Sequence, residues 1–88
     1  MRSTRVITFG YDWGHPPRAA DHVFDVRDLD DPPKPEQIQE RAADIVDRIA
    51  EGDTVAIGCD EGRRRSPAVA KALARIFGGI HIEHEEKE

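Results

Sequence analysis

The sequence has 88 residues, of which 38% are hydrophobic, and a formal net charge of -5 at pH 7. A chain of this length forms one domain with a small core, and its acidity excludes a surface that binds polyanions over its whole extent, so any contact with nucleic acid must depend on a local basic patch. The single cysteine excludes an internal disulfide, no apolar stretch approaches the roughly 20 residues that span a membrane, and without a signal-peptide pattern we expect a reducing, cytoplasmic setting.

The first half of the chain predicts two strands and a helix. Residues 5–9 form a strand that Gly10 ends, and residues 22–26 form a second strand after a loop rich in glycine and proline. An acidic connection with two prolines leads to a helix over about residues 35–50. The isoleucines of this segment recur with a helical period, so the helix packs on the sheet through one apolar face.

The second half predicts a strand, a helix and a final strand. Residues 54–57 are apolar throughout, as expected for a strand covered on both faces. A helix follows over about residues 67–77, residues 80–82 form the last strand, and residues 84–88 are a charged tail. The order β-β-α-β-α-β predicts a single α/β sandwich with a four-stranded, mostly parallel sheet, two main helices and at least one right-handed crossover.

Three short segments follow predicted strands directly: Gly10–Tyr11, Asp25–Arg27 and Cys59–Arg65. Ligands of such sheets bind outside the carboxyl ends of parallel strands. We therefore expect these segments to converge on one rim of the sheet and to form the functional site there.

The loop Gly58–Ser66, with the sequence GCDEGRRRS, joins the third strand to the second helix. Its C-x5-R spacing is similar to that of protein tyrosine phosphatase-like anion loops. In that chemistry the loop amides wrap a tetrahedral oxyanion, Arg65 closes over it, and the Cys59 thiolate lies beneath as a nucleophile. A helix N-terminus and arginines would lower the pKa of the thiol. The neighbouring carboxylates of Asp60 and Glu61 act against this. Catalysis would also require a general acid, for which the sequence offers Asp25, Asp28, Asp30 and Asp31.

The same residues also have a purely structural interpretation. A cysteine that follows a buried strand is commonly a small core residue, and Ser66 and Pro67 suit the N-cap and first position of a helix. Arg63 and Arg64 either form an exposed basic spot for RNA phosphates or offset the acidic helices. The histidines predict no metal site, because His81 and His84 would lie on opposite faces of one strand.

Three blocks of the sequence together cover most of the predicted fold: FGYDWGHPPRAAD at residues 9–21, VFDVRDLDDP at residues 23–32 and IGCDEGRRRSPAVAKALA at residues 57–74. They resemble the C-terminal domain of the RapZ family of RNase adapter proteins, which shows strings similar to SFGYKYG-P-AD, FDVR-L-NP and IGCTGGRHRS-A-A in the same order. The first two strings have no part in the phosphatase spacing, so this resemblance is more specific than the similarity to phosphatase loops.

The resemblance implies an α/β domain that binds a small phosphorylated metabolite, which is an amino-sugar phosphate in characterised members that also bind small RNA and a ribonuclease. In the implied pocket Cys59 is a wall or hydrogen-bonding group. This sequence departs from the family in having Asp60-Glu61 in place of Thr-Gly, Arg64 in place of histidine, and a shorter connection after FDVR. It contains no G-x-x-x-x-G-K-[ST] motif, so nucleotide hydrolysis is not implied. The pocket residues implied are Asp25, Cys59, Gly62, Arg65 and Ser66, with Tyr11 and Arg27 nearby.

We expect a phosphate- or phosphosugar-binding sensor or adapter module, with no cofactor, no metal and no membrane contact, and with a protein partner or a second copy of the chain as a further candidate partner. Two alternatives stay open. One is a cysteine-dependent phosphatase-like enzyme that uses Cys59, Arg65 and Asp25, and the other is an RNA-binding adapter that uses Arg63 and Arg64. The candidate ligand-binding residues are Tyr11, Asp25, Arg27, Cys59, Asp60, Glu61, Gly62, Arg63, Arg64, Arg65 and Ser66.

Overall fold

Four strands and two helices make up residues 3–85, the part of the chain that the computed structural model describes. The order of elements is β-β-α-β-α-β, as the sequence predicts, with one added turn of 3-10 helix, η1, after the first strand. The elements are β1 (Thr4–Gly10), η1 (Tyr11–Trp13), β2 (His22–Asp25), α1 (Pro35–Val46), β3 (Thr54–Cys59), α2 (Arg65–Ile76) and β4 (Ile80–His84).

The strands form one sheet in the order β2-β3-β1-β4, and every neighbouring pair is parallel. The predicted α/β fold class is confirmed, and the sheet is wholly rather than mostly parallel. Thr8 of β1 lies beside Ile57 of β3 and His84 of β4, so these three strands end close together. All four carboxyl ends therefore lie on one rim of the sheet.

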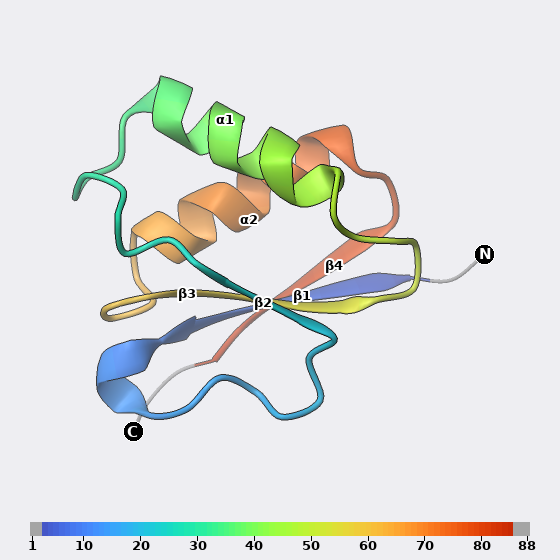
Figure 1. The fold of residues 1–88 in the computed structure, drawn as a ribbon, viewed down its shortest axis with the longest axis horizontal. Helices are drawn as coiled ribbons and strands as arrows, with labels where there is room; N and C mark the ends of the chain where they lie inside the picture. Colours follow the sequence, from blue (N-terminus) through green and yellow to red (C-terminus); the bar gives the residue numbers. More distant parts are fainter. Residues whose placement is uncertain (1–2, 86–88) are drawn as a thin grey trace.

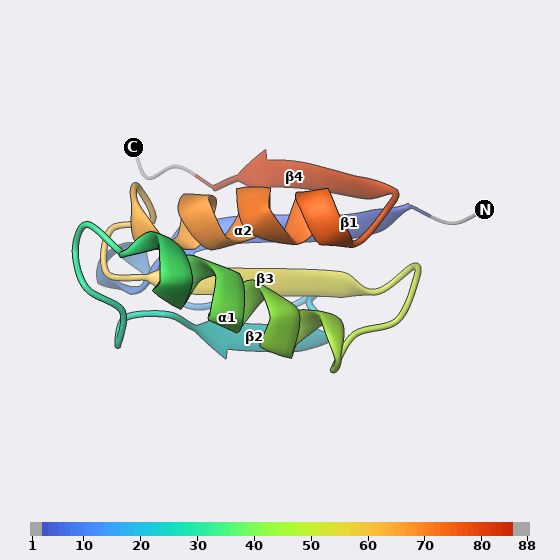
Figure 2. The same ribbon diagram turned by 90° about the horizontal axis from the view of Figure 1, so that it is seen from above.

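Both helices lie on the same face of the sheet (Figures 1 and 2). The connections through α1 and α2 step across the sheet in one direction, from β2 to β3 and from β3 past β1 to β4. Right-handed crossovers that step the same way place their helices on one face. The connection from β1 to β2 steps the opposite way, and residues 11–21 accordingly pass across the other face (Figure 1).

The main core lies between the sheet and the two helices. Its members share almost complete exclusion from solvent, and α1 and α2 also pack against one another through it. Burial of these aliphatic side chains is the main source of stability for such a domain. The core residues are Val6, Val26, Leu29, Ala42, Ile45, Val55, Ile57, Cys59, Val69, Ala70, Ala72 and Leu73.

The opposite face of the central strands is also covered. Ile7, Phe9 and Ala56 are buried although they are not part of the helix-side core. The ring of Phe9 contacts Tyr11 edge-on, with ring centroids 4.9 Å apart, so the connection that begins at η1 protects this face. The expectation that residues 54–57 are covered on both sides is confirmed.

The helix boundaries differ from the predicted ones. Helix α1 ends at Val46 rather than at Ala50, because the backbone tightens and the amide of Arg48 bonds the carbonyl of Ile45 at 2.9 Å. Ile49 still packs against the core although it lies outside the helix. Its apolar character at a helical spacing therefore led the sequence pattern to extend the helix too far. Helix α2 begins at Arg65, two residues before the predicted start.

Strand β1 extends one residue beyond its predicted range at each end, and β3 and β4 each run two residues further at their carboxyl ends. Strand β2 stops one residue early, at Asp25. The charged tail predicted for residues 84–88 begins inside β4, since His84 is the last residue of that strand. Residues 86–88 lie outside the described part of the chain.

Gly58 is required by the packing of the face opposite the helices. A Cβ atom at this position would lie 2.4 Å from Cζ of Phe9. We expect Gly58→Ala to lower the free energy of unfolding by about 1–3 kcal/mol, as for other overpacked sites, measured by urea denaturation. Gly78→Ala is the matched control, since a Cβ at Gly78 meets no atom within 4 Å. Equal stability of the two variants would contradict this account of the packing.

Candidate functional site

The loop between β3 and α2 is held against the end of β1 by backbone and side-chain hydrogen bonds. The amide of Asp12 donates to the carbonyl of Asp60 at 2.8 Å, and Nε1 of Trp13 donates to the carbonyl of Glu61 at 3.0 Å. Since β2 ends on the same rim, the three segments expected to converge do so. The 3-10 turn η1 thus forms one wall of the site.

Two glycines allow this close approach. A Cβ on Gly10 would lie 2.5 Å from the carbonyl carbon of Glu61, and a Cβ on Gly62 would lie 2.7 Å from the carbonyl carbon of Phe9. Gly62 also has a φ of 73°, a left-handed conformation that side chains disfavour. Backbone therefore packs directly on backbone here, and this contact fixes the path of the loop.

The sulfur of Cys59 lies at the centre of the loop. It accepts hydrogen bonds from the amides of Gly62 at 3.2 Å and Ser66 at 3.4 Å, and its contact with the Ser66 hydroxyl is 3.3 Å long. Burial alone would raise the pKa of this thiol. The hydrogen bonds from the Ser66 side chain and from the amides of Ser66, Gly62 and Arg64 outweigh that effect, so the net pKa is lowered.

The same sulfur also caps helix α2. The N-cap residue is Arg64, whose side chain makes no capping hydrogen bond, and the amide of Ser66 in the first turn is bonded by Cys59 instead. The interpretation of Ser66 and Pro67 as the N-cap and first helical residue is therefore wrong. Pro67 occupies the third helical position, where its missing N–H costs no helical hydrogen bond.

Arg65 is a buried connector. Its side chain points inward and the residue is 8% exposed. Nη1 donates to the carbonyls of Arg27 at 2.7 Å and Leu29 at 3.3 Å, and Nη2 donates to a carboxylate oxygen of Asp60 at 2.8 Å. The guanidinium thus ties the loop to the segment after β2, and it already holds one carboxylate.

Tyr11, Asp25 and Arg27 form a separate cluster beside this connector. The guanidinium of Arg27 bonds both carboxylate oxygens of Asp25, at 2.7 to 3.1 Å, and lies 3.9 Å from the centre of the Tyr11 ring. The hydrogen bonds from Arg27 lower the pKa of Asp25 more than its partial burial raises it. Asp25 therefore remains a carboxylate at neutral pH.

A cavity of about 430 Å³ opens beside the loop. Three consecutive arginines and Cys59 contribute to its wall, and four carboxylates oppose them. Arg64 forms an exposed ion pair with Asp31 at 3.6 Å, whereas Arg63 makes no ion pair with any described residue. The lining residues are Asp12, Asp31, Cys59, Asp60, Glu61, Arg63, Arg64 and Arg65.

Six of the eleven candidate ligand-binding residues line this cavity, namely Cys59 to Glu61 and Arg63 to Arg65. Gly62 and Ser66 shape the loop through their amides, and the cluster of Tyr11, Asp25 and Arg27 lies next to the cavity. The sequence interpretation did not include Asp12, for which there was no local signal, and it considered Asp31 only as a candidate acid. Loop closure against β1 brings Asp12 into the wall.

The histidines of β4 lie in local polar contacts. Among residues 3–85 no group of three histidine, cysteine, aspartate or glutamate side chains is placed to hold a metal ion. His84 contacts the hydroxyl of Thr8 through Nδ1 at 2.6 Å, and His81 lies beside Glu83. No helix within the same range is long and apolar enough to cross a bilayer.

Comparison with known proteins identifies relatives that are much longer. The chain matches no protein-family model. It is 32% identical over 117 aligned positions to proteins from two strains of Thermus thermophilus, each named a nucleotide-binding protein. The alignment covers 96% of this chain, but the chain spans only 42% of the length of these relatives. Because the alignment is longer than the 88-residue chain, the relatives also carry additional residues within the aligned region.

The contacts of Arg65 predict a structural role. Arg65→Met removes all three hydrogen bonds and leaves two backbone carbonyls and Asp60 without their partner. We expect the free energy of unfolding to fall by about 1–3 kcal/mol, measured by urea denaturation. Arg75→Met, at the exposed end of the same helix, should cost less. A smaller loss for Arg65→Met than for Arg75→Met would refute this role.

The hydrogen bonds to Cys59 predict an acidic thiol. Titration of the thiolate absorbance in the ultraviolet should give a pKa below that of a free cysteine, and Ser66→Ala should raise it because one stabilising donor is lost. Ser3→Ala, on an exposed residue, is the control and should leave the titration unchanged.

This titration also has a consequence for stability. Because the pKa is lower in the folded than in the unfolded chain, ionisation of Cys59 stabilises the fold increasingly as the pH rises through the folded-state value, and this contribution is lost as the pH falls through it. A pKa at or above the ordinary value would show that burial, not hydrogen bonding, dominates at the sulfur.

Proposed function

We propose that this chain is a binding module for a small phosphorylated molecule, such as a phosphosugar, whose phosphate lies at the loop between β3 and α2. The supporting observation is the convergence of the Gly62 and Ser66 amides on the sulfur of Cys59, and these donors also lower the pKa of the thiol. A buried thiol ionises more easily only where donors and positive potential outweigh the loss of solvent. The amides that stabilise a negative charge on sulfur belong to the loop and to the first turn of a helix, which are the groups that favour bound anions.

The arginines supply the remaining part of the phosphate site. Arg63 and Arg64 line the cavity from exposed positions. Arg65 contributes the edge of its guanidinium that donates to the Asp60 carboxylate in this structure. A phosphate that reaches Arg65 replaces the Asp60 carboxylate as its partner. The site is therefore selective for ligands that compete with an internal carboxylate, and arginine binds phosphate oxygens well enough to permit this exchange.

Binding accounts for the surroundings of Cys59 better than phosphate transfer does. The acidic thiol would suit a nucleophile, but transfer also needs a protonated acid near the leaving group. The pKa values of Asp25 and Asp28 are lowered by hydrogen bonds from Arg27 and Arg41, respectively, so both are ionised at neutral pH. We therefore favour retention of the phosphorylated ligand over its hydrolysis.

The relatives provide independent support for a small-molecule function, since both are named nucleotide-binding proteins. We infer that the chain forms a single domain similar to the C-terminal domain of the RapZ family. In this interpretation the module acts as a sensor or adapter, and the state of its ligand is read by a protein partner or by a second copy of the chain.

Asp60→Asn tests the site directly. Removing the competing charge at Arg65 should tighten the binding of inorganic phosphate and glucosamine 6-phosphate by about tenfold, measured by isothermal titration calorimetry, while Arg64→Ala weakens it. Asp44→Asn is the control, because Asp44 of α1 pairs with Arg48, just beyond the end of that helix, and lies outside this cavity. If no variant binds either compound while all remain folded, the proposed function is wrong.

A further inference from the structure

The edge of the sheet at β4 is open. This strand is last in the order β2-β3-β1-β4, and among residues 3–85 it pairs with β1 alone. Figure 2 shows it along one side of the molecule, with no described strand or helix beyond it. An uncovered edge strand presents a row of backbone donors and acceptors to which a further strand can bind.

The hydrogen bonds to β1 determine which backbone groups of β4 point away from the sheet. The amide of Thr4 donates to the carbonyl of Gly79 at 3.0 Å, and the amide of Glu85 donates to the carbonyl of Thr8 at 2.8 Å. The register between these two bonds is unbroken, and successive residues of a strand direct their backbone groups to opposite sides. The residues whose N–H and C=O groups lie on the outer edge are therefore Ile80, Ile82 and His84.

The opposite edge of the sheet is protected, whereas β4 is not. At edge strand β2, Nη1 of Arg41 on α1 donates to the carbonyl of Asp25 at 3.1 Å, so a side chain already holds an acceptor that a further strand would need. No such bond reaches the backbone of Ile80 or Ile82 from another residue in the range 3–85. Strand β4 also lacks the proline and lysine residues by which natural edge strands resist pairing.

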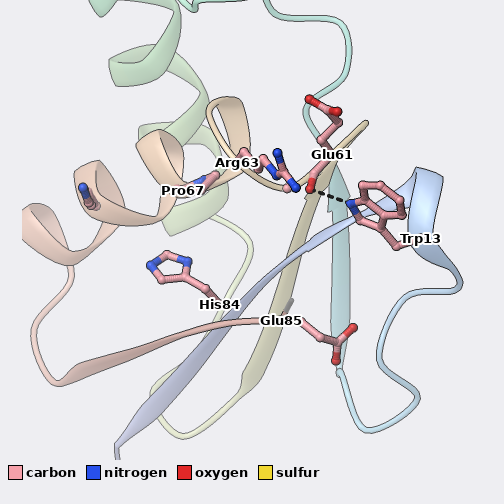
Figure 3. Close-up of a pocket in the computed structure, with 8 residues that line it drawn as sticks. Trp13, Glu61, Arg63, Pro67, His84 and Glu85 are labelled. Atoms are coloured by element: carbon pink, nitrogen blue, oxygen red, sulfur yellow. Dashed lines mark hydrogen bonds between the residues drawn. The ribbon is translucent and has the colours of Figure 1, made fainter. Parts of the chain in front are cut away.

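The helix-side face of β4 is incompletely covered. Ile80 and Ile82 pack against the core but are only half-buried, whereas Val6, beside Ile82 on β1, is fully buried. His84 lies on the same face, where it lines a cavity of about 550 Å³ together with Pro67 of α2 (Figure 3). A strand added to this edge would cover the remaining apolar surface of the two isoleucines.

The sequence of β4 is complementary to itself in an antiparallel arrangement. When two copies pair about Ile82, this residue meets its own copy, and His81 lies opposite Glu83 of the second copy. Because the backbone groups of Ile82 point outward, the two isoleucines form a hydrogen-bonded pair. An imidazole opposite a carboxylate is a favourable cross-strand pair. Centring the pairing on His81 or on Glu83 would instead oppose two like side chains, so the register about Ile82 is preferred.

We propose that two copies of this chain associate through β4, in antiparallel orientation about Ile82. The two four-stranded sheets then become one continuous sheet, with both pairs of helices on the same face. Because the central strands are antiparallel, the loops Gly58–Ser66 of the two copies lie at opposite ends of the dimer. The association does not depend on phosphate binding, since no residue of β4 lines the cavity beside that loop.

Sedimentation equilibrium of the full chain over a range of concentrations up to about 1 mM tests the association, and the mass should rise from one chain to two. His84→Pro removes an outward N–H without affecting the bonds to β1, and it should weaken the dimer by at least about tenfold. His84→Ala is the matched control, because it loses the same side chain but keeps the N–H, and it should remain within about threefold of the unaltered chain. A single-chain mass at every concentration, or equal weakening by both variants, would refute the proposal.

Exchange of two side chains tests the register. His81→Glu places two carboxylates opposite one another and should weaken the dimer by about tenfold. The double variant His81→Glu with Glu83→His again opposes an imidazole and a carboxylate, and it should regain most of the affinity. Arg5, which bonds Glu83, lies beside position 81 on β1 and so keeps a neighbouring carboxylate in the double variant. Urea denaturation checks that each variant is folded. A folded double variant that associates no better than His81→Glu would overturn the pairing about Ile82, while unchanged phosphate binding would leave the function proposed above intact.

Discussion

The guanidinium of Arg65 joins segments that lie far apart in the chain. It bonds two carbonyls after β2 and a carboxylate in the loop after β3, and it does so from the first turn of α2. Leu29, whose carbonyl it binds, is itself part of the core. A buried arginine is stable only when its donors are matched. The shape of the rim, including the inward course of the loop around Cys59, depends on this match.

The rim is built around acceptors that belong to the protein itself. The sulfur of Cys59 accepts hydrogen bonds from backbone amides, which lower the pKa of the thiol, and Asp60 takes a donor of Arg65 that would otherwise be available to a ligand. Asp25 similarly occupies Arg27. The strongest donors are therefore engaged before any ligand arrives, and an external phosphate gains only the difference between its own interactions and those that it replaces. Arg63, which makes no ion pair with any described residue, lines the cavity beside the loop.

The order and type of every strand and of both main helices could be predicted because each depends on local patterns of apolar residues, glycine and proline. The two helix boundaries that were wrong have tertiary causes. Ile49 keeps the helical spacing of apolar residues after the helix has ended, because the core requires an apolar side chain there in either conformation. The early start of α2 depends on a sulfur cap supplied by Cys59, which no capping pattern in the sequence predicts.

The sequence predicted that the loop after β3 lies on the rim, where it lines a cavity, but it did not predict the contacts of each arginine. Arg63, Arg64 and Arg65 are adjacent and chemically identical, yet Arg65 is buried on carbonyl groups, Arg64 pairs with Asp31, and Arg63 makes no ion pair within residues 3–85. These differences arise from acceptors more than thirty residues away in the chain. The pairing of Asp25 with Arg27 is easier to predict from sequence, since residues two apart across a turn can form a hydrogen bond.

Gly10 of β1 and Gly62 of the loop depend on one another. Each glycine lacks the Cβ atom that would collide with the backbone of the segment in which the other glycine lies. A side chain at either position would separate the two segments, and a compensating change at the other position could not restore the contact, since neither has an atom left to remove. Positions 10 and 62 must therefore both be glycine in any chain that keeps this arrangement. Their joint presence is a stricter marker of the rim than the cysteine and arginine spacing, because the glycines require the neighbouring strand to be in contact and that spacing does not.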